Sequence, residues 1–164
     1  MPHSSLAIAN EFLRRAREID RSLTQMKLQK LVYIAHGWCL AFSKSPLIED
    51  RIEAWEFGPV IRRLYDATSR YGRSPVSRFI KWGDDTPFRS DDGEEAFDQL
   101  SDPEQRIVDD IWEHYGDLEA FQLSDLTHQD GTSWAQVFEH GKNRVISDES
   151  IREHFAALAD KDAV

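Results

Sequence analysis

A single apolar stripe over residues 28–42 constrains the fold of this 164-residue chain more than any other feature of its sequence. Its members recur at the spacing of one helix face, and they are Leu28, Leu31, Val32, Ala35, Trp38, Cys39 and Phe42. Ile34 and Leu40 add apolar surface beside the stripe. A helix that is apolar around so much of its circumference is usually central to a core. We therefore predict a central helix that Thr24 caps and that ends before Pro46.

The rest of the chain is patterned mostly as helices, which are predicted over residues 5–18, 59–71, 102–115, 118–126, 133–139 and from 147 onward. Residues 46–57 predict two short strands joined by a turn at 49–51, after which Gly58 ends the strand and Pro59 begins a helix. Acidic and turn-forming residues over 83–100 predict an exposed loop. The expected fold is mainly α, a compact single-domain helical bundle with a small β-hairpin over residues 1–164.

Charge is distributed unevenly along the chain, whose net charge is −10. Residues 1–82 hold 14 basic and 8 acidic side chains, a net charge of +6, whereas residues 83–164 hold 6 basic and 22 acidic ones, a net charge of −16. The acidic half either only keeps the protein soluble or meets a basic partner, whose association it would accelerate. The sequence leaves both alternatives open.

Familiar catalytic motifs are absent from the sequence. It has no glycine-rich phosphate loop, no H-E-x-x-H pair and no G-x-S-x-G nucleophile elbow. None of the six His pairs with another at the i, i+4 spacing of two zinc ligands on one helix face. Cys39, the single cysteine, lies on the apolar stripe and is expected to be an inert buried thiol. We therefore expect no enzyme, no cofactor and no metal site.

Two histidines and a group of aromatic residues allow alternative roles. His36 is expected in the core, with a place on a binding surface as the alternative. His128 is expected to complement the dipole at a helix end, since an acid–base role would lack an identifiable nucleophile. Trp38, Trp55 and Phe57 are expected to pack in the core, or else to form a partner-binding groove.

Basic residues on the first two predicted helices are the only support for an alternative function, that of a DNA-binding transcriptional regulator. They are Arg14, Arg15, Arg17, Arg21, Lys27 and Lys30. We expect them to form solvated helix faces, because a protein of net charge −10 repels the phosphate backbone as a whole. Nucleic acid is therefore disfavoured as a partner.

Three blocks of sequence occur in a recognisable order and spacing. The first is LQKLVYIAHGW at residues 28–38; the second is EAWEFGPV at 53–60, followed by Leu64-Tyr65 and Tyr71-Gly72; the third comprises Leu123-Ser124, Leu126-Thr127-His128 and Ser133-Trp134. Together they resemble the Panacea domain family of the SocA and GepA type, over about residues 26–155. In that family a proline often precedes the tryptophan of the third block, where this chain has Ser133.

The resemblance implies a bacterial antitoxin that binds and neutralises its cognate toxin by protein–protein contact. In the SocA branch it implies a proteolytic adaptor that delivers the toxin to the ClpXP protease. A cytoplasmic location is expected, because no apolar run approaches the roughly 18 residues of a membrane span and residues 1–10 do not form a signal peptide. The family's signature positions, which either contact the partner or hold the fold, are Lys27, Gln29, Lys30, Tyr33, His36, Trp38, Trp55, Gly58, Pro59, Tyr65, Thr127, His128 and Trp134.

Overall fold

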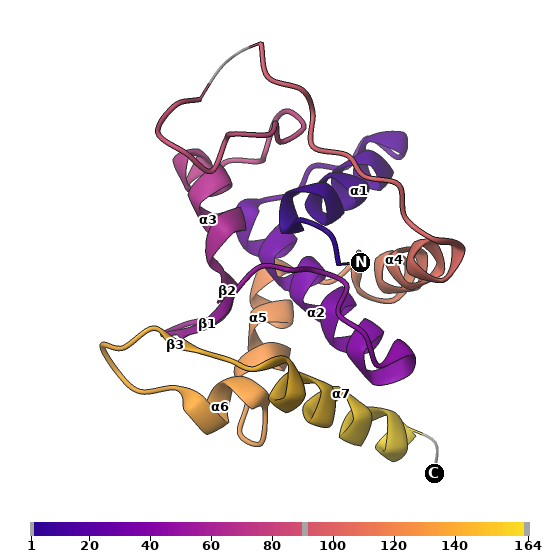
Figure 1. Ribbon diagram of the computed structural model, residues 1–164, viewed down its shortest axis with the longest axis vertical. Helices are drawn as coiled ribbons and strands as arrows, with labels where there is room; N and C mark the ends of the chain where they lie inside the picture. Colours follow the sequence, from indigo (N-terminus) through magenta and orange to yellow (C-terminus); the bar gives the residue numbers. More distant parts are fainter. Residues whose placement is uncertain (1, 90–91, 163–164) are drawn as a thin grey trace.

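The computed structural model describes residues 2–89 and 92–162, and it is mainly α with a small sheet (Figure 1). Its α-helices are α1 (Ser5–Glu18), α2 (Gln25–Ser43), α3 (Arg62–Thr68), α4 (Asp102–Tyr115), α5 (Ala120–His128), α6 (Ser133–Val137) and α7 (Asp148–Asp162). Its strands are β1 (Ile52–Trp55), β2 (Gly58–Ile61) and β3 (Arg144–Val145). Each helix overlaps a stretch that the sequence predicts as helical, so the predicted fold class is confirmed.

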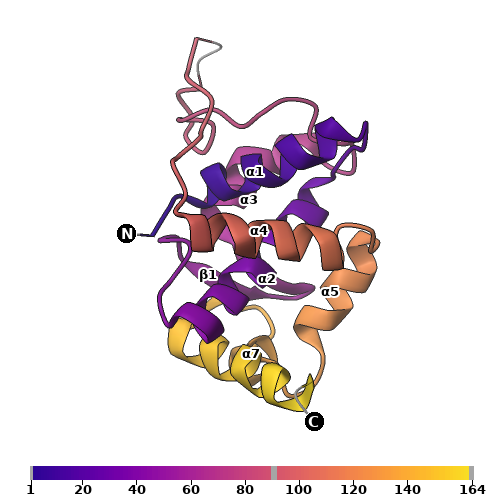
Figure 2. The same ribbon diagram turned by 90° about the vertical axis from the view of Figure 1, so that its right-hand side faces the viewer.

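Helix α2 is the centre of the molecule, as its apolar stripe predicts. It passes between α1 and α7, with α4 and α5 beside it (Figures 1 and 2). Every residue of α2 from Leu28 to Leu40 except Trp38 is buried. Thr24 caps the helix by accepting a hydrogen bond from the backbone N–H of Lys27. The end of the stripe departs from the prediction, because Phe42 is 69% exposed and stacks on Trp38.

The predicted position of the hairpin turn is wrong. Strands β1 and β2 pair antiparallel with Trp55 opposite Gly58, so Glu56 and Phe57 form the turn and residues 49–51 precede the first strand. Gly58 has φ +120°, a conformation that glycine adopts readily and that lets the chain reverse within two residues. Pro59 lies in β2 rather than in a helix. A proline is tolerated there because β2 is an edge strand.

Two helix boundaries and the number of strands also differ from the sequence prediction. Helix α3 starts at Arg62 and is followed by a 3-10 turn over Ser69–Tyr71. Helix α5 continues through Thr127 and His128 instead of ending before them. The sheet also has a third strand, β3, which pairs with β1 and completes the order β2-β1-β3. Two exposed residues are too short a segment to show the alternation that identifies strands.

The predicted acidic loop contains no helix or strand at its described positions, and residues 90 and 91 lie outside the described residues. A buried amide from α1 fixes both ends of this loop. Asn10 donates to the carbonyl oxygens of Ile80 and Ala96, and its side-chain oxygen accepts from the Ile80 N–H, all at 2.8 Å. The hydrogen bonds of this buried amide are fully satisfied, as those of buried polar groups usually are.

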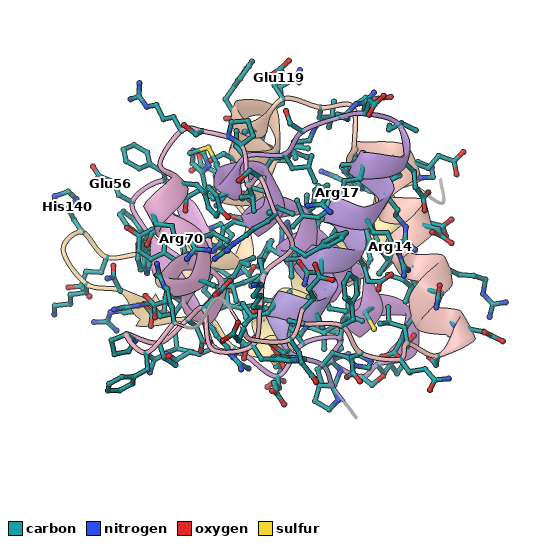
Figure 3. All side chains as sticks on the ribbon, turned by 90° about the horizontal axis from the view of Figure 1, so that it is seen from above. Arg14, Arg17, Glu56, Arg70, Glu119 and His140 are labelled. Atoms are coloured by element: carbon teal, nitrogen blue, oxygen red, sulfur yellow. The ribbon has the colours of Figure 1, made fainter. Side chains whose placement is uncertain are left out.

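The sequence predicts solvated helix faces for all six cations of this region, and the structure agrees only in part: Arg14, Arg17 and Arg21 are exposed, whereas Arg15 and Lys30 are not. Arg15 pairs with Glu11 at 3.0 Å and with Asp109 at 2.7 Å, and only 11% of its side chain is exposed. The guanidinium of Arg17, labelled on α1 in Figure 3, lies 3.9 Å from the ring centroid of Phe79. These contacts engage groups that phosphate binding would require, which weakens the case for a DNA-binding regulator.

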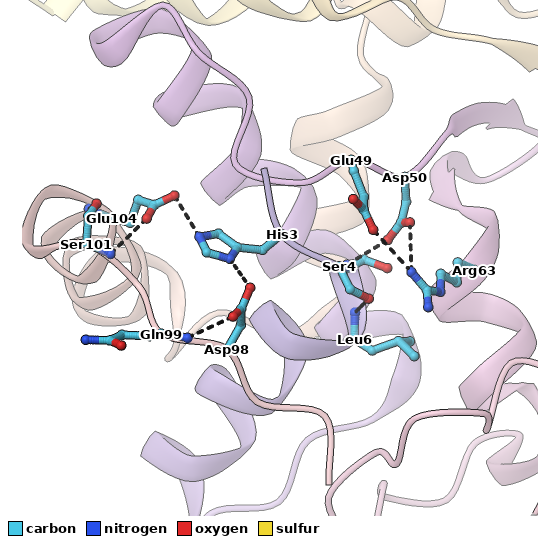
Figure 4. A network of polar contacts seen from close by, with 11 residues as sticks. His3, Ser4, Leu6, Glu49, Asp50, Arg63, Asp98, Gln99, Ser101 and Glu104 are labelled. Atoms are coloured by element: carbon cyan, nitrogen blue, oxygen red, sulfur yellow. Dashed lines mark hydrogen bonds and ion pairs between the residues drawn. The ribbon is translucent and has the colours of Figure 1, made fainter. Parts of the chain in front are cut away.

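The N-terminal residues are tied to the acidic loop and to α4 through His3 (Figure 4). Its Nδ1 lies 2.5 Å from Asp98 and its Nε2 lies 2.9 Å from Glu104. Burial lowers the pKa of His3, but hydrogen bonds from the ring to these two carboxylates outweigh it, and the pKa is raised above its usual 6.5. Because both ring nitrogens face carboxylates, the charged imidazolium is the form that satisfies them.

Replacing His3 with Gln is expected to destabilise the protein in a pH-dependent way. The folded-state pKa exceeds the unfolded value, so the contribution is complete below about pH 6.5 and is lost as the pH rises through the folded pKa. The loss in the free energy of unfolding should be about 1–2 kcal/mol at pH 6 and smaller at pH 9. Urea unfolding at both pH values measures it, with His140→Gln as the exposed control. A loss that is equal at both pH values would contradict this role.

Candidate functional site

The β1–β2 hairpin is fastened to the central helix through polar side chains of α2. Gln29, only 4% exposed, donates from Nε2 to the carbonyl oxygen of Ile61 at 3.0 Å and accepts from the Ile61 N–H at 2.9 Å. The Gln29 side chain thus makes the two backbone hydrogen bonds that a residue of a neighbouring strand would make with Ile61. The hairpin therefore has one defined position on α2.

Lys30 makes the second attachment, one residue further along α2. Its Nζ donates to the carbonyl oxygen of Pro59 at 2.7 Å, and only 3% of the residue is exposed. Burial lowers the pKa of Lys30 to about 7. No carboxylate pairs with Lys30 within residues 2–89 and 92–162. The prediction that Lys30 belongs to a solvated basic face is therefore wrong.

Gly58 packs directly against Lys30. A Cβ atom at this position would lie 3.1 Å from Lys30 Nζ, 3.4 Å from Thr127 Oγ1 and 3.7 Å from His128 Cβ. A side chain would also be strained at φ +120°. Gly58 is therefore the point where the hairpin, α2 and α5 approach one another.

Helix α5 holds the turn of the hairpin from the other side. Ser124 donates from Oγ to the carbonyl oxygen of Phe57 at 2.8 Å. Thr127, 2% exposed, donates to the backbone oxygen of Ser124 at 2.8 Å. His128 Nδ1 hydrogen-bonds to the same backbone oxygen. His128 thus lies at the helix end where the sequence places it, with its ring against Trp134.

Two tryptophans close the cluster on the side of α6. Trp134 donates from Nε1 to the carbonyl oxygen of Trp55 at 2.6 Å, and Trp55 donates in turn to the buried Glu53 at 2.9 Å. The ring of Trp55 packs edge-on against Tyr65 with centroids 4.8 Å apart. Tyr33, fully buried, hydrogen-bonds Ser133 at 2.7 Å and so fixes the start of α6.

The structure thus brings ten of the thirteen predicted site residues together around the hairpin. They are Gln29, Lys30, Tyr33, Trp55, Gly58, Pro59, Tyr65, Thr127, His128 and Trp134. Most of these side chains hold the hairpin against α2, α5 and α6. The surface that they shape is formed mainly by their neighbours.

Three predicted site residues lie elsewhere. Lys27 donates to the carbonyl oxygen of Gly116 at the end of α4. His36 is fully buried, as expected; its Nε2 donates to Asp148 at 2.9 Å, and its Nδ1 faces the backbone N–H groups of residues 47 and 48. Trp38 packs edge-on against Phe155 on the side of α7.

Two grooves flank Phe57, which is 70% exposed at the tip of the hairpin. The Lys30 groove, about 780 Å³, has lining residues that include Met26, Gln29, Lys30, Trp55, Phe57 and Tyr65. The Phe121 groove, about 650 Å³, has lining residues that include Met26, Phe57, Phe121, Leu126 and His128. Because both grooves share Met26 and Phe57, they form one continuous surface, here called the Phe57 surface.

Helix α5 contributes side chains to this surface that were not among the residues predicted for the site. The buried face of α5 carries Leu123, Ser124 and Thr127, while Phe121 is 69% exposed and Leu126 is 44% exposed. A helix that buries hydroxyl groups and exposes a phenylalanine inverts the usual amphipathic pattern. Such an inversion is readable from the sequence once the helix phase is known, and it is typical of an interaction surface.

The remaining chemistry of the described residues is sparse. Cys39 is 2% exposed, and burial raises the pKa of its thiol to about 11, which disfavours a nucleophilic thiolate. In the part of the chain that the structure describes, no group of three or more His, Cys, Asp or Glu side chains could hold a metal ion. Among the helices described, none has the length and apolarity needed to cross a membrane.

Comparisons with known proteins identify relatives of this chain by sequence. The family model described as "Antitoxin SocA-like, Panacea domain" matches residues 28–135, from α2 to α6. Antitoxin SocA of Caulobacter vibrioides (strain NA1000 / CB15N) is 40% identical over 76 residues, which are 46% of this chain and 40% of that protein. The aligned part therefore spans less than half of the curated relative. No solved structure matches the chain.

Proposed function

Since this chain belongs to the SocA-like antitoxin family with a Panacea domain, we propose that it neutralises a cognate toxin by binding it. The observation that carries the proposal is the family match over residues 28–135, which contains the whole cluster around the hairpin. The relative named Antitoxin SocA supports the same role. The action proposed is non-enzymatic, takes place in the cytoplasm and uses residues 1–164 as one domain.

We place the toxin on the Phe57 surface. Its exposed members are Met26 at 43%, Phe57 at 70%, Phe121 at 69% and Leu126 at 44%. Large apolar side chains gathered on a folded surface are typical of protein–protein contacts, and aromatic residues often dominate their binding energy. The hydrogen bonds of Gln29 and Ser124 hold the hairpin in place, so Phe57 is presented without a large ordering cost.

Co-expression tests the antitoxin role. The protein encoded by the adjacent open reading frame is expressed from an inducible promoter, with or without this chain from a second promoter. We expect that the neighbour arrests growth and that this chain restores it, with the two proteins co-purifying. Growth that is no better in the presence of this chain would contradict the proposal.

A finer form of the proposal is that this chain delivers its toxin to ClpXP, as the resemblance to the SocA branch implies. An adaptor must hold toxin and protease together, so purified ClpXP should degrade the toxin faster when this chain is present. Toxin turnover that this chain leaves unchanged would remove the adaptor role but would retain neutralisation by sequestration.

A further inference from the structure

The Lys30 groove combines apolar walls with basic side chains that no carboxylate of the described residues pairs. Lys30 lies at its floor and Arg73 lines its rim, and neither forms an ion pair within residues 2–89 and 92–162. Glu56 is the one carboxylate among the described lining residues. In a chain of net charge −10, a groove lined by two basic side chains that no described carboxylate pairs is a local exception.

The amine of Lys30 is also incompletely hydrogen-bonded. A charged lysine amine has three N–H donors, and the Pro59 carbonyl accepts one of them. A Cβ at Gly58 would lie 3.1 Å from Nζ, so a residue without a side chain lets the hairpin lie this close to the amine. A buried amine without a carboxylate carries a desolvation cost that an opposite charge would offset. The groove therefore complements an acidic side chain that is flanked by apolar residues.

We propose that the toxin inserts an apolar segment with one acidic side chain into the Lys30 groove, and that its carboxylate pairs with Lys30 Nζ. This inference rests on the proposed neutralisation by direct contact and adds the chemistry of that contact. Met26, Trp55 and Phe57 contact the apolar part of the segment, and Arg73 adds a second basic side chain to the groove that receives its carboxylate. This proposal differs from the alternative that the charge distribution suggested, in which a basic toxin would bind the acidic half of the chain. Here an acidic side chain of the toxin binds a basic residue of this chain.

Proton uptake provides the test, because pairing with a carboxylate favours the charged amine. With a pKa of about 7, Lys30 is mostly neutral at pH 8 in the free protein, and pairing raises that pKa. Calorimetric titration of the neighbouring gene product in buffers of different ionisation enthalpy should therefore show uptake of close to one proton per complex. The other titratable or charged groups around the groove are His128, Glu56, Tyr65, Arg73 and Tyr33, and burial raises the pKa of Tyr33 to about 12.

Lys30→Met should abolish this uptake and weaken binding by about 30-fold or more, because the partner's carboxylate would be buried without a counter-charge. Lys27→Met is the matched control. Lys27 also donates to a backbone carbonyl from α2, but it does not line either groove, so binding and uptake should be unchanged. If Lys30→Met does not fold, NMR titration of the Lys30 Cε resonance in the unmodified protein decides, and its midpoint should rise by at least about two pH units in the complex.

The possible outcomes separate this inference from the proposed function. A tight complex without proton uptake, or with an unshifted Lys30 midpoint, would overturn the carboxylate pairing and leave neutralisation intact. A complex that Lys30→Met does not weaken would do the same. The absence of any complex with the neighbouring gene product would overturn both.

Discussion

Replacing Phe57 with Ala is expected to weaken binding of the toxin by about 30-fold or more, equivalent to at least about 2 kcal/mol. Phe57 is 70% exposed at the hairpin tip and is shared by both grooves, so the truncation removes the centre of the Phe57 surface. The fold should be unaffected, because exposed substitutions usually change stability by less than about 0.5 kcal/mol. Calorimetry measures binding, and thermal unfolding checks the fold.

Phe42→Ala is the matched control for this experiment. Phe42 is also a phenylalanine and is 69% exposed, but it lies at the end of α2, where it stacks on Trp38 away from both grooves. Its truncation should leave toxin affinity within about twofold of the parent. Equal losses for the two variants, or a loss for Phe42→Ala alone, would show that the toxin binds elsewhere.

The central helix could be predicted from the sequence because its signal is local. The apolar stripe, the Thr24 cap and Pro46 all lie within one segment, and they agree with one another. The position of the hairpin turn could not be predicted in the same way. Residues 49–51 are as polar as a turn requires, whereas the real turn contains Phe57, whose exposure depends on α5 and not on its neighbours in sequence.

The candidate site was predictable as a set of residues but not as a surface. Resemblance to the family indicated Lys30, Gly58 and Thr127, and the structure brings them together. A Cβ on Gly58 would lie 3.1 Å from Lys30 Nζ and 3.4 Å from Thr127 Oγ1. Their burial follows from contacts between segments almost 100 residues apart, which no periodicity reports. A lysine inside an apolar helix would ordinarily be assigned to solvent, and only the Pro59 carbonyl explains why Lys30 is not.

The charge division along the sequence also has a different meaning in three dimensions. Acidic residues of the second half pair with cations of the first, as Asp109 does with Arg15 and Asp117 with Arg21. Part of the predicted electrostatic asymmetry is therefore used within the molecule. Within the part of the chain that the structure describes, the basic side chains that pair with no carboxylate include Lys30 and Arg73, which both line the Lys30 groove. A partner that binds the Phe57 surface would therefore interact with the local charge of the Lys30 groove more than with the net charge of the chain.

Gly37→Ala is expected to destabilise the protein by about 3 kcal/mol, although alanine is the better helix former. A Cβ at Gly37 would lie 2.2 Å from Cε2 of Phe155 and 2.6 Å from its Cζ. The ring cannot easily move away, because it packs edge-on against Tyr33 and Trp38 at 5.9 and 5.2 Å between centroids. Urea unfolding measures the loss.

A double mutant separates this steric conflict from other effects of the substitution. Phe155→Ala alone should cost about 3–5 kcal/mol through the cavity that it leaves. With Gly37→Ala added, the new methyl group enters that cavity, so the combined loss should be smaller than the sum by at least about 1 kcal/mol. Such a result would mean that Phe155 of α7 stabilises α2, the helix that carries Lys30. Helix α7 lies outside residues 28–135 of the family match. Losses that simply add would mean that α7 stabilises α2 by contacts other than this ring.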